Sequence, residues 1–149
     1  MKKSILIFGA GINQIELIRE ARKLGVNSIV IDPSDCAAGK DEADIFYQVE
    51  GGDYNSTKQI ALKHNVKGIV TGQMEKPLPI MAKLAQELGF IFNTPKVIER
   101  SLNKILMKAA FIENGIQCAK GVSFSENEEI TKVKLKNLNF PIIVKPTDS

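Results

Sequence analysis

Residues 4–33 read SILIFGAGINQIELIREARKLGVNSIVIDP, and the expected architecture follows from this stretch. Residues 4–8 are an apolar, partly β-branched run, typical of a strand buried on both faces of a parallel sheet. After a glycine turn, apolar residues recur at helical spacing as far as Gly25, a common helix terminator. Residues 27–31 are a second apolar run that ends in an Asp-Pro turn. Together these features predict a βαβ unit.

The same alternation continues through the next sixty residues. The patterns predict helices at residues 55–64 and 78–88, and short strands at residues 45–49, 68–71 and 90–92. Strands and helices that alternate with short links favour an α/β fold, a Rossmann-like parallel sheet with helices on both faces. We expect this first domain to comprise residues 1–93.

A different pattern begins at residue 94. It predicts helices at residues 95–101, 103–114 and 126–136, a weak strand at 121–124 and a strong apolar strand at 140–145. A lone strand with a few helices buries its faces poorly. We therefore expect residues 94–149 to be an incomplete α+β domain, and the chain to be a truncated piece of a longer protein.

Composition and charge exclude several classes of function. The 149 residues are 44% hydrophobic and 25% charged, with a net charge of +3 and no clustering of the basic residues. Nucleic-acid binding needs a basic face, and none is visible. Two distant cysteines and one histidine give no zinc ligand set. No apolar run approaches the ~20 residues that span a bilayer. We expect a cytoplasmic protein with no metal ligands in these residues.

Gly9 and Gly11 lie between the first strand and the first helix, where dinucleotide-binding folds place their phosphate loop. The dinucleotide fingerprint requires a third glycine at position 14, which is Gln14, so the fingerprint fails and close packing of helix on strand is not expected. Asp32 lies at about the right distance for a ribose-binding acid, but the sequence does not assign that role. Two interpretations stay open: the glycines only permit a tight turn, or their amides bind a carboxylate or phosphate of a small substrate.

Several segments together resemble the ATP-grasp ligases. These are the glycine turn, the IDP after the second strand, and the segments GQME (72–75), NTP (93–95), SLNKILMK (101–108), NGI (114–116) and FPIIVKP (140–146). The chain looks most similar to the large chain of carbamoyl phosphate synthetase, with biotin carboxylase and the purine-pathway carboxylases as cousins. It departs from the family pattern at Asn103, where Asp is usual, and at Gln117, where Pro is frequent. It ends before the family's phosphate-covering loop, adenine hinge and magnesium ligands.

The resemblance implies an ADP-forming carboxylate–amine ligase that uses ATP and Mg²⁺ and a small-molecule carboxylate substrate. By this resemblance the residues 1–93 precede the ATP-grasp domain, and residues 94–149 begin it. It places Lys104 and Lys145 at ATP and makes Gly9, Gly11 and Glu75 candidates for substrate binding. No catalytic residue and no metal ligand is expected within these 149 residues, which we expect to bind ATP weakly and to be inactive alone.

Each charged candidate also has a plain structural interpretation. Lys145 follows a very apolar segment that would hold its stem, and Lys104 follows a potential cap and opposes the helix dipole, a local conflict that favours a ligand. The alternative interpretation is that both lysines are ordinary solvent-exposed side chains. Glu75 is equally well explained as an acid in the first turn of a helix.

Two rival functions remain at this stage. The chain is alternatively a Rossmann-like module that binds a small ligand without catalysis, or a structural module that forms a homodimer through helices at its sheet edges.

Overall fold

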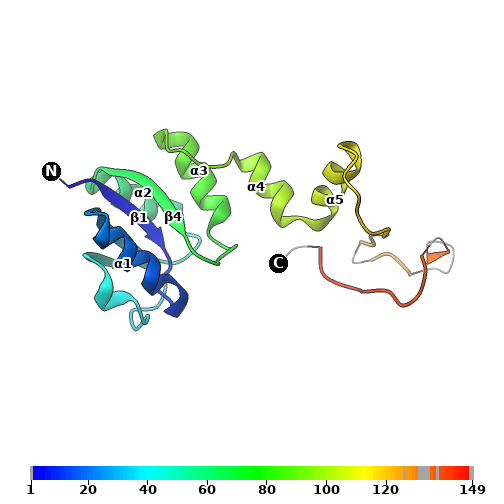
Figure 1. Ribbon diagram of the computed structural model, residues 1–149, viewed down its shortest axis with the longest axis horizontal. Helices are drawn as coiled ribbons and strands as arrows, with labels where there is room; N and C mark the ends of the chain where they lie inside the picture. Colours follow the sequence, from blue (N-terminus) through cyan, green and yellow to red (C-terminus); the bar gives the residue numbers. More distant parts are fainter. Residues whose placement is uncertain (1, 126, 131–134, 137, 148–149) are drawn as a thin grey trace. The chain divides into compact units, whose positions relative to one another are not determined.

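The computed structural model describes residues 2–125, 127–130, 135–136 and 138–147 (Figure 1). The chain forms two compact units, Met1–Ile98 and Glu99–Ser149. The division falls inside helix α4 (Pro95–Leu102), whereas the predicted domain boundary precedes this helix. Each unit is described by itself below.

The first unit is built on a parallel sheet of four strands in the order β3-β2-β1-β4. The strands are β1 (Ser4–Phe8), β2 (Asn27–Asp32), β3 (Ile45–Gln48) and β4 (Val66–Thr71). Phe8 at the end of β1 is in register with Ile31 of β2 and with Thr71 of β4. The chain thus places β2 and β3 on one side of β1 and then crosses to place β4 on the other side.

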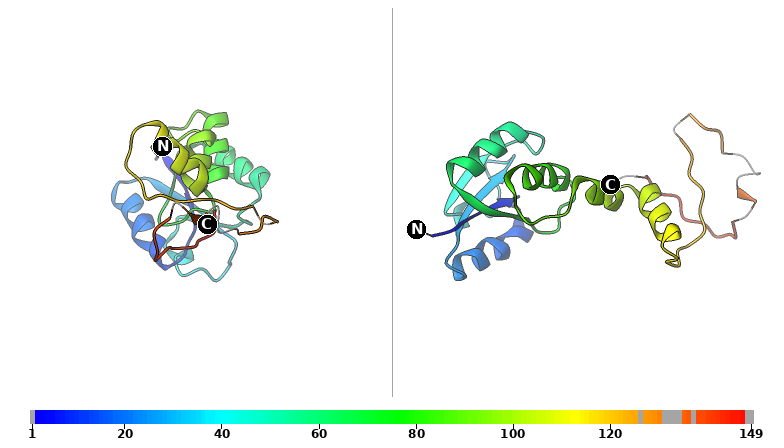
Figure 2. Two further views of the ribbon diagram at one scale, coloured as in Figure 1. Left: turned by 90° about the vertical axis from the view of Figure 1, so that its right-hand side faces the viewer. Right: turned by 90° about the horizontal axis from the view of Figure 1, so that it is seen from above.

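Helices cover both faces of this sheet. Helix α1 (Ile15–Lys23) packs Ile18 and Ala21 against Ile7 and Val30. Helices α2 (Tyr54–Lys63) and α3 (Leu78–Leu88) contribute to the core on the opposite face, which contains Leu6 of β1. Figure 2 shows α1 and α2 on opposite sides of the sheet. The predicted Rossmann-like α/β fold is confirmed.

The two central strands, β1 and β2, contribute to the core on both faces of the sheet. Leu6, Ile7 and Val30 are completely buried and alternate between the two faces. Burying one aliphatic side chain of this size stabilises a fold by about 1.5–3 kcal/mol. The two apolar runs of residues 4–31 therefore specify the sheet because they are buried whichever way their side chains point.

One predicted strand of the first unit is absent. Residues 90–92 form no strand. Gly89, with φ of 73°, ends α3, and the amide of Phe90 donates back to the carbonyl of Ala85 at 2.9 Å. Phe90 and Phe92 then pack onto the core as side chains, while Ile91 is fully exposed. Their apolar character reflects this packing and not a fifth strand.

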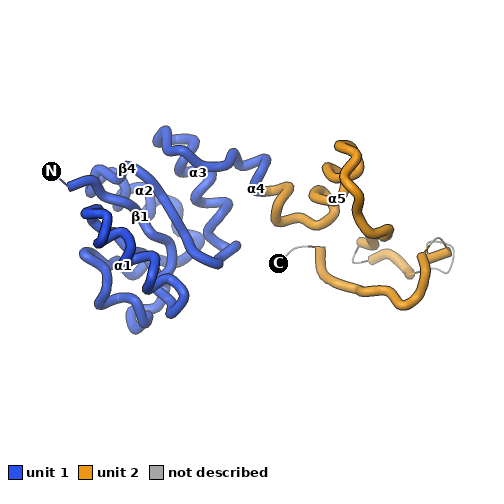
Figure 3. Tube along the Cα trace, in the orientation of Figure 1, with its two compact units in different colours: residues 1–98 blue, residues 99–149 orange. Residues whose placement is uncertain are grey.

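The second unit contains the end of α4 and helix α5 (Lys104–Glu113) (Figure 3). The strands predicted at residues 121–124 and 140–145 are absent, and Phe140, Ile143 and Val144 are largely exposed. A strand exists only through hydrogen bonds to a neighbour, and no described segment of this unit pairs with either stretch. In the helix predicted at residues 126–136, residues 127–130 are not helical, and positions 126 and 131–134 lie outside the described residues.

Two structural features are absent from the described part of the chain. None of its helices combines the length and the apolar character needed to cross a membrane. Its His, Cys, Asp and Glu side chains form no group of three or more that could hold a metal ion.

Candidate functional site

The order of the strands marks the place where a ligand is expected. The chain passes from β1 to β2 on one side of β1 and later forms β4 on the other side of β1. The loops that follow β1 and β4 therefore diverge. Open parallel sheets bind ligands outside the carboxyl ends of their strands at such a switch point. Here the two loops are the glycine turn, residues 9–11, and a second loop, residues 72–75, which we call the Gly72 loop. Thr71 Oγ1 donates to the carbonyl of Phe8 at 2.9 Å and ties the two strand ends together.

Gly9 is favoured by its backbone conformation and lies close to the side chain of Met74. Its φ is +92°, in the region that favours glycine, and a Cβ atom at this position would lie 2.4 Å from Met74 Sδ in the Gly72 loop. Its amide donates to the carbonyl of Ile31 at 2.8 Å. These contacts support the interpretation that Gly9 permits a tight turn, and its role in substrate binding stays a prediction.

Asp32 holds the glycine turn from the neighbouring strand. Its Oδ2 accepts a hydrogen bond from the amide of Ala10 at 2.8 Å, and its Oδ1 accepts one from the amide of Ser34 at 2.8 Å. Both carboxylate oxygens are thus engaged within the protein, in charge-assisted bonds of the stronger kind. The amides of Gly9 and Ala10 are thus both donated within the protein, and the substrate-binding roles of Gly9 and Gly11 stay predictions.

Gln14 fills the position of the missing fingerprint glycine in an unexpected way. Its side chain is buried, with only 4% of its surface exposed, and its amide nitrogen Nε2 donates to the carbonyl of Gly72. Its Oε1 lies so close to Gly11 that a Cβ there would stand 2.9 Å away. The glutamine therefore lies between the two loops, and its expected effect on the packing of helix against strand stays a prediction.

Glu75 lies at the same sheet edge, at the end of the Gly72 loop. Its side chain is exposed, and its carbonyl accepts from the amide of Leu78 at 3.0 Å. Helix α3 begins at Leu78, with Pro77 as its cap residue. Glu75 therefore precedes the first turn, so the interpretation of Glu75 as a first-turn acid is wrong. Its substrate role remains a prediction.

In the second unit, the beginning of α5 meets the segment that carries Lys145. Asn103 caps the helix through its Oδ1, which accepts from the amides of Ile105 at 3.0 Å and Leu106 at 3.1 Å. The amide of Lys104, the first residue of α5, donates to the carbonyl of Thr147 at 2.7 Å. The structure thereby brings the main chain of Lys104 close to a residue two positions beyond Lys145. Lys145 itself is exposed.

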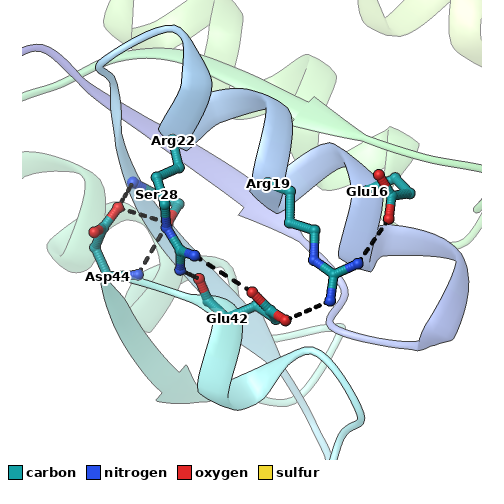
Figure 4. A network of polar contacts seen from close by, with 6 residues as sticks. All are labelled: Glu16, Arg19, Arg22, Ser28, Glu42 and Asp44. Atoms are coloured by element: carbon teal, nitrogen blue, oxygen red, sulfur yellow. Dashed lines mark hydrogen bonds and ion pairs between the residues drawn. The ribbon is translucent and has the colours of Figure 1, made fainter.

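Most of the charges between α1 and the short helix η2 (Lys40–Glu42) serve the fold (Figure 4). Arg19 and Arg22 of α1 both reach Glu42, at 2.7 Å and 3.5 Å. Asp44 Oδ2 accepts from the amide and the hydroxyl of Ser28, both at 2.8 Å, and these bonds, the amide bond first, hold the pKa of Asp44 below its ordinary value. This network anchors the β2–β3 connection on α1.

A shallow hollow of about 500 Å³ lies beside the edge strand β3, lined by residues of β3, α2 and the loop between them. Tyr47 stands at its rim, with its hydroxyl 2.7 Å from His64 Nε2 and 3.0 Å from Lys63 Nζ. No pattern in the sequence predicts this hollow. Because β3 and β4 are the two opposite edges of the sheet, it is separate from the switch point.

Comparison with known proteins covers nearly the whole chain. The chain is 27% identical over 144 residues to a formate-dependent phosphoribosylglycinamide formyltransferase of Sulfurisphaera tokodaii, covering 97% of this chain and 36% of that protein. The phosphoribosylglycinamide synthetase of Anaerococcus prevotii superposes with a TM-score of 0.77 at 27% identity, over 99% of this chain and 38% of that one. No family model matches the chain.

A third similarity involves a nucleotide complex. The N5-carboxyaminoimidazole synthetase of Staphylococcus aureus, solved with ADP, superposes over 77% of this chain and 31% of its own with a TM-score of 0.65 at 23% identity, which shows a common fold. These relatives are ATP-grasp enzymes, as the resemblance implied. The narrower resemblance to carbamoyl phosphate synthetase stays a prediction. The chain spans little more than a third of the length of the first two relatives.

Proposed function

We propose that this chain is the N-terminal portion of an ATP-grasp, ADP-forming carboxylate–amine ligase. The observation that carries the proposal is the continuous similarity of 97% of the chain to 36% of a formate-dependent phosphoribosylglycinamide formyltransferase. The switch point of the first unit supports it independently, because it is where an open α/β sheet binds small ligands.

The proposed reaction has two steps. A carboxylate oxygen attacks the γ-phosphorus of ATP, and the bond to the bridging oxygen of ADP breaks, which leaves an acyl phosphate. An amine then attacks the acyl carbon and expels inorganic phosphate, with loss of a proton from nitrogen. The negative charge spread over the transferred phosphoryl group requires fixed cations around it.

Lys104 and Lys145 are the cations that this chain would supply. An ammonium group is a compact charge suited to phosphate oxygens. The hydrogen bond from the Lys104 amide to Thr147 supports this role, because it brings the α5 terminus to the Lys145 segment. The described residues offer no suitable ligand group for Mg²⁺. Under this proposal the Mg²⁺ ligands lie in other parts of the full-length protein, and no metal-dependent step is assigned to these residues.

The relatives suggest which substrates to test. Formate and phosphoribosylglycinamide stand in the name of the formyltransferases, so we propose this pair as the first probes. The carbamoyl phosphate synthetase-like form of the activity is the narrower alternative, with bicarbonate and ammonia as its probes. Full-length protein incubated with ATP, Mg²⁺ and each pair in turn should release ADP at a sustained rate only when one pair is complete. Absence of ADP with every pair would contradict the proposal.

A second candidate function rests on the closed core of the first unit. Its sheet is covered on both faces by buried clusters formed within residues 1–98, so it could act as a small-ligand-binding or homodimeric module without catalysis. This alternative predicts a ligand-free dimer whose population rises with protein concentration in analytical ultracentrifugation, with no ADP release. A cytoplasmic setting and a homodimer remain predictions under either proposal.

A further inference from the structure

Gln14 is a buried polar side chain at the start of α1. It ends the short 3-10 helix η1 (Ile12–Gln14) that leads into α1, and it makes no capping hydrogen bond there. Only 4% of its surface is exposed. Burying an amide is unfavourable unless it forms hydrogen bonds. Its burial is therefore best explained by the contact it makes.

That contact crosses the switch point. Gln14 Nε2 donates to the carbonyl of Gly72, which is 58 residues away in sequence and begins the loop after β4. The side-chain carbon Cδ of Gln14 and the sulfur of Met74 both lie over Gly9, where an added Cβ would stand 3.5 Å and 2.4 Å from them. One side chain thus joins the loop after β1 to the loop after β4.

The Gly72 loop has a conformation that needs such support. Gln73 has a φ of +55°, a left-handed conformation that is uncommon for a residue with a side chain. Conformations of this kind persist only where surrounding contacts fix them. The bond to the Gly72 carbonyl fixes the residue just before Gln73, and Met74 lies against Gly9 just after it. Glu75 follows directly.

We propose that Gln14 is a positioning residue that holds the Gly72 loop against the glycine turn and so presents Glu75 to the non-nucleotide substrate. This inference rests on the proposed ligase function. Position 14 is where the dinucleotide fingerprint has a glycine. A glycine has no side chain that could donate to the Gly72 carbonyl, so Gln14 gives this position a different role. Gln14 acts through the loop and need not touch the substrate.

Two substitutions separate this role from simple filling of space. Gln14→Leu keeps most of the volume but leaves the Gly72 carbonyl without its donor. Gln14→Glu keeps the shape of the side chain. When ionised, its carboxylate can only accept and so cannot bond to the Gly72 carbonyl, whereas the protonated carboxyl can donate to it. Burial raises the pKa of a carboxyl group, so the glutamate variant should recover as the pH is lowered. Gln48→Leu is the matched control, because exposed Gln48 donates its side-chain amide to the carbonyl of Pro33 at 3.0 Å.

The test is steady-state kinetics of the full-length protein, with formate and phosphoribosylglycinamide as probes. We expect Gln14→Leu to raise the KM of at least one of these two probes roughly five- to tenfold, the equivalent of one lost buried hydrogen bond. The KM of ATP should stay within about twofold of the parent value. Gln14→Glu should approach the parent as the pH falls toward 5, and Gln48→Leu should match the parent throughout.

Hydrogen exchange provides the second readout. In Gln14→Leu, amides 72–76 should exchange faster while the rest of the sheet keeps its protection. Equal rises in the KM of ATP and of both probes, or unchanged kinetics and exchange, would overturn the positioning role alone. Absence of ATP-dependent turnover by the unmodified protein with every substrate pair would overturn the proposed function, and this role with it.

Discussion

The amide of Lys104 donates a 2.7 Å hydrogen bond to the carbonyl of Thr147, and so joins the first residue of α5 to the end of the segment that carries Lys145. The first amides of α5 are already paired with Asn103 and Thr147, but the positive end of the helix dipole still favours anions. A cation at this position adds to that field instead of neutralising it. The local arrangement therefore suits a polyphosphate better than it suits the stability of the helix alone.

Substitution of the two lysines should weaken ATP binding by the full-length protein. Lys104→Ala and Lys145→Ala should each raise the KM of ATP about tenfold, because each removes one charge-assisted contact. The exposed Lys120 provides the control, and Lys120→Ala should leave the KM unchanged. If both lysines bind one polyphosphate, the double variant should deviate from additivity. Unchanged ATP kinetics in all variants would exclude both residues from the nucleotide site.

Gly9→Ala should destabilise the first unit. The substitution places a Cβ at a φ of +92° and 2.4 Å from Met74 Sδ, which together should lower the free energy of unfolding by more than about 2 kcal/mol. Gly51→Ala is the matched control, since a Cβ there would meet nothing within 4 Å. Urea denaturation measures both, and adding Met74→Ala to Gly9→Ala should recover part of the loss. Equal stability of the two glycine variants would contradict the account of the turn.

Asp32→Asn tests whether this residue holds the turn or binds a ligand. The variant replaces the charged acceptor of the Ala10 and Ser34 amides, and we expect a loss of about 1–2 kcal/mol in unfolding free energy. Asp35→Asn, at an exposed neighbouring aspartate, should change stability little. A stable Asp32→Asn protein that has lost only ligand affinity would support the ribose-acid interpretation instead.

The prediction for acid pH concerns Asp44. Its pKa is held below the ordinary value chiefly by the amide of Ser28, with the Ser28 hydroxyl as a further donor. A carboxyl with a depressed native pKa stabilises the fold above its unfolded pKa, near 4, and that stabilisation is lost as the pH falls through the native value. The stability difference between the parent and Asp44→Asn should be largest near pH 7 and should shrink below about pH 4. A difference that is constant from pH 7 to pH 2 would contradict this linkage.

The four strands and three main helices of the first unit could be predicted because their sequence signals are local and strong. The runs at β1 and β2 are apolar on both faces, and the helices between strands are bounded by Gly25, Gly89 and the capping Asp53, whose carboxylate accepts from Ser56 at 3.0 Å. The predicted strand and helix ends differ from the observed ones by only one or two residues in most cases. Such patterns report burial directly.

The failures have a common physical cause. Apolar residues at positions 90–92 and 140–145 have the composition of strands, but a strand also needs a hydrogen-bonding neighbour that composition does not reveal. The contact of Gln14 was not predicted for a related reason. The fingerprint considers only whether position 14 is a glycine. The burial of Gln14 instead depends on a hydrogen bond to the carbonyl of Gly72, which is far away in sequence.

The most direct test of the ligase proposal is the fate of the carboxylate oxygen. Formate labelled with ¹⁸O in both oxygens is incubated with the full-length protein, ATP, Mg²⁺ and phosphoribosylglycinamide, and the released phosphate is analysed by mass spectrometry. Because the carboxylate attacks the γ-phosphorus and its oxygen leaves with phosphate, we predict one ¹⁸O atom in each phosphate formed. Release of unlabelled phosphate alongside formylated product would contradict an acyl phosphate intermediate, and no ADP release with either substrate pair would contradict the ligase assignment itself.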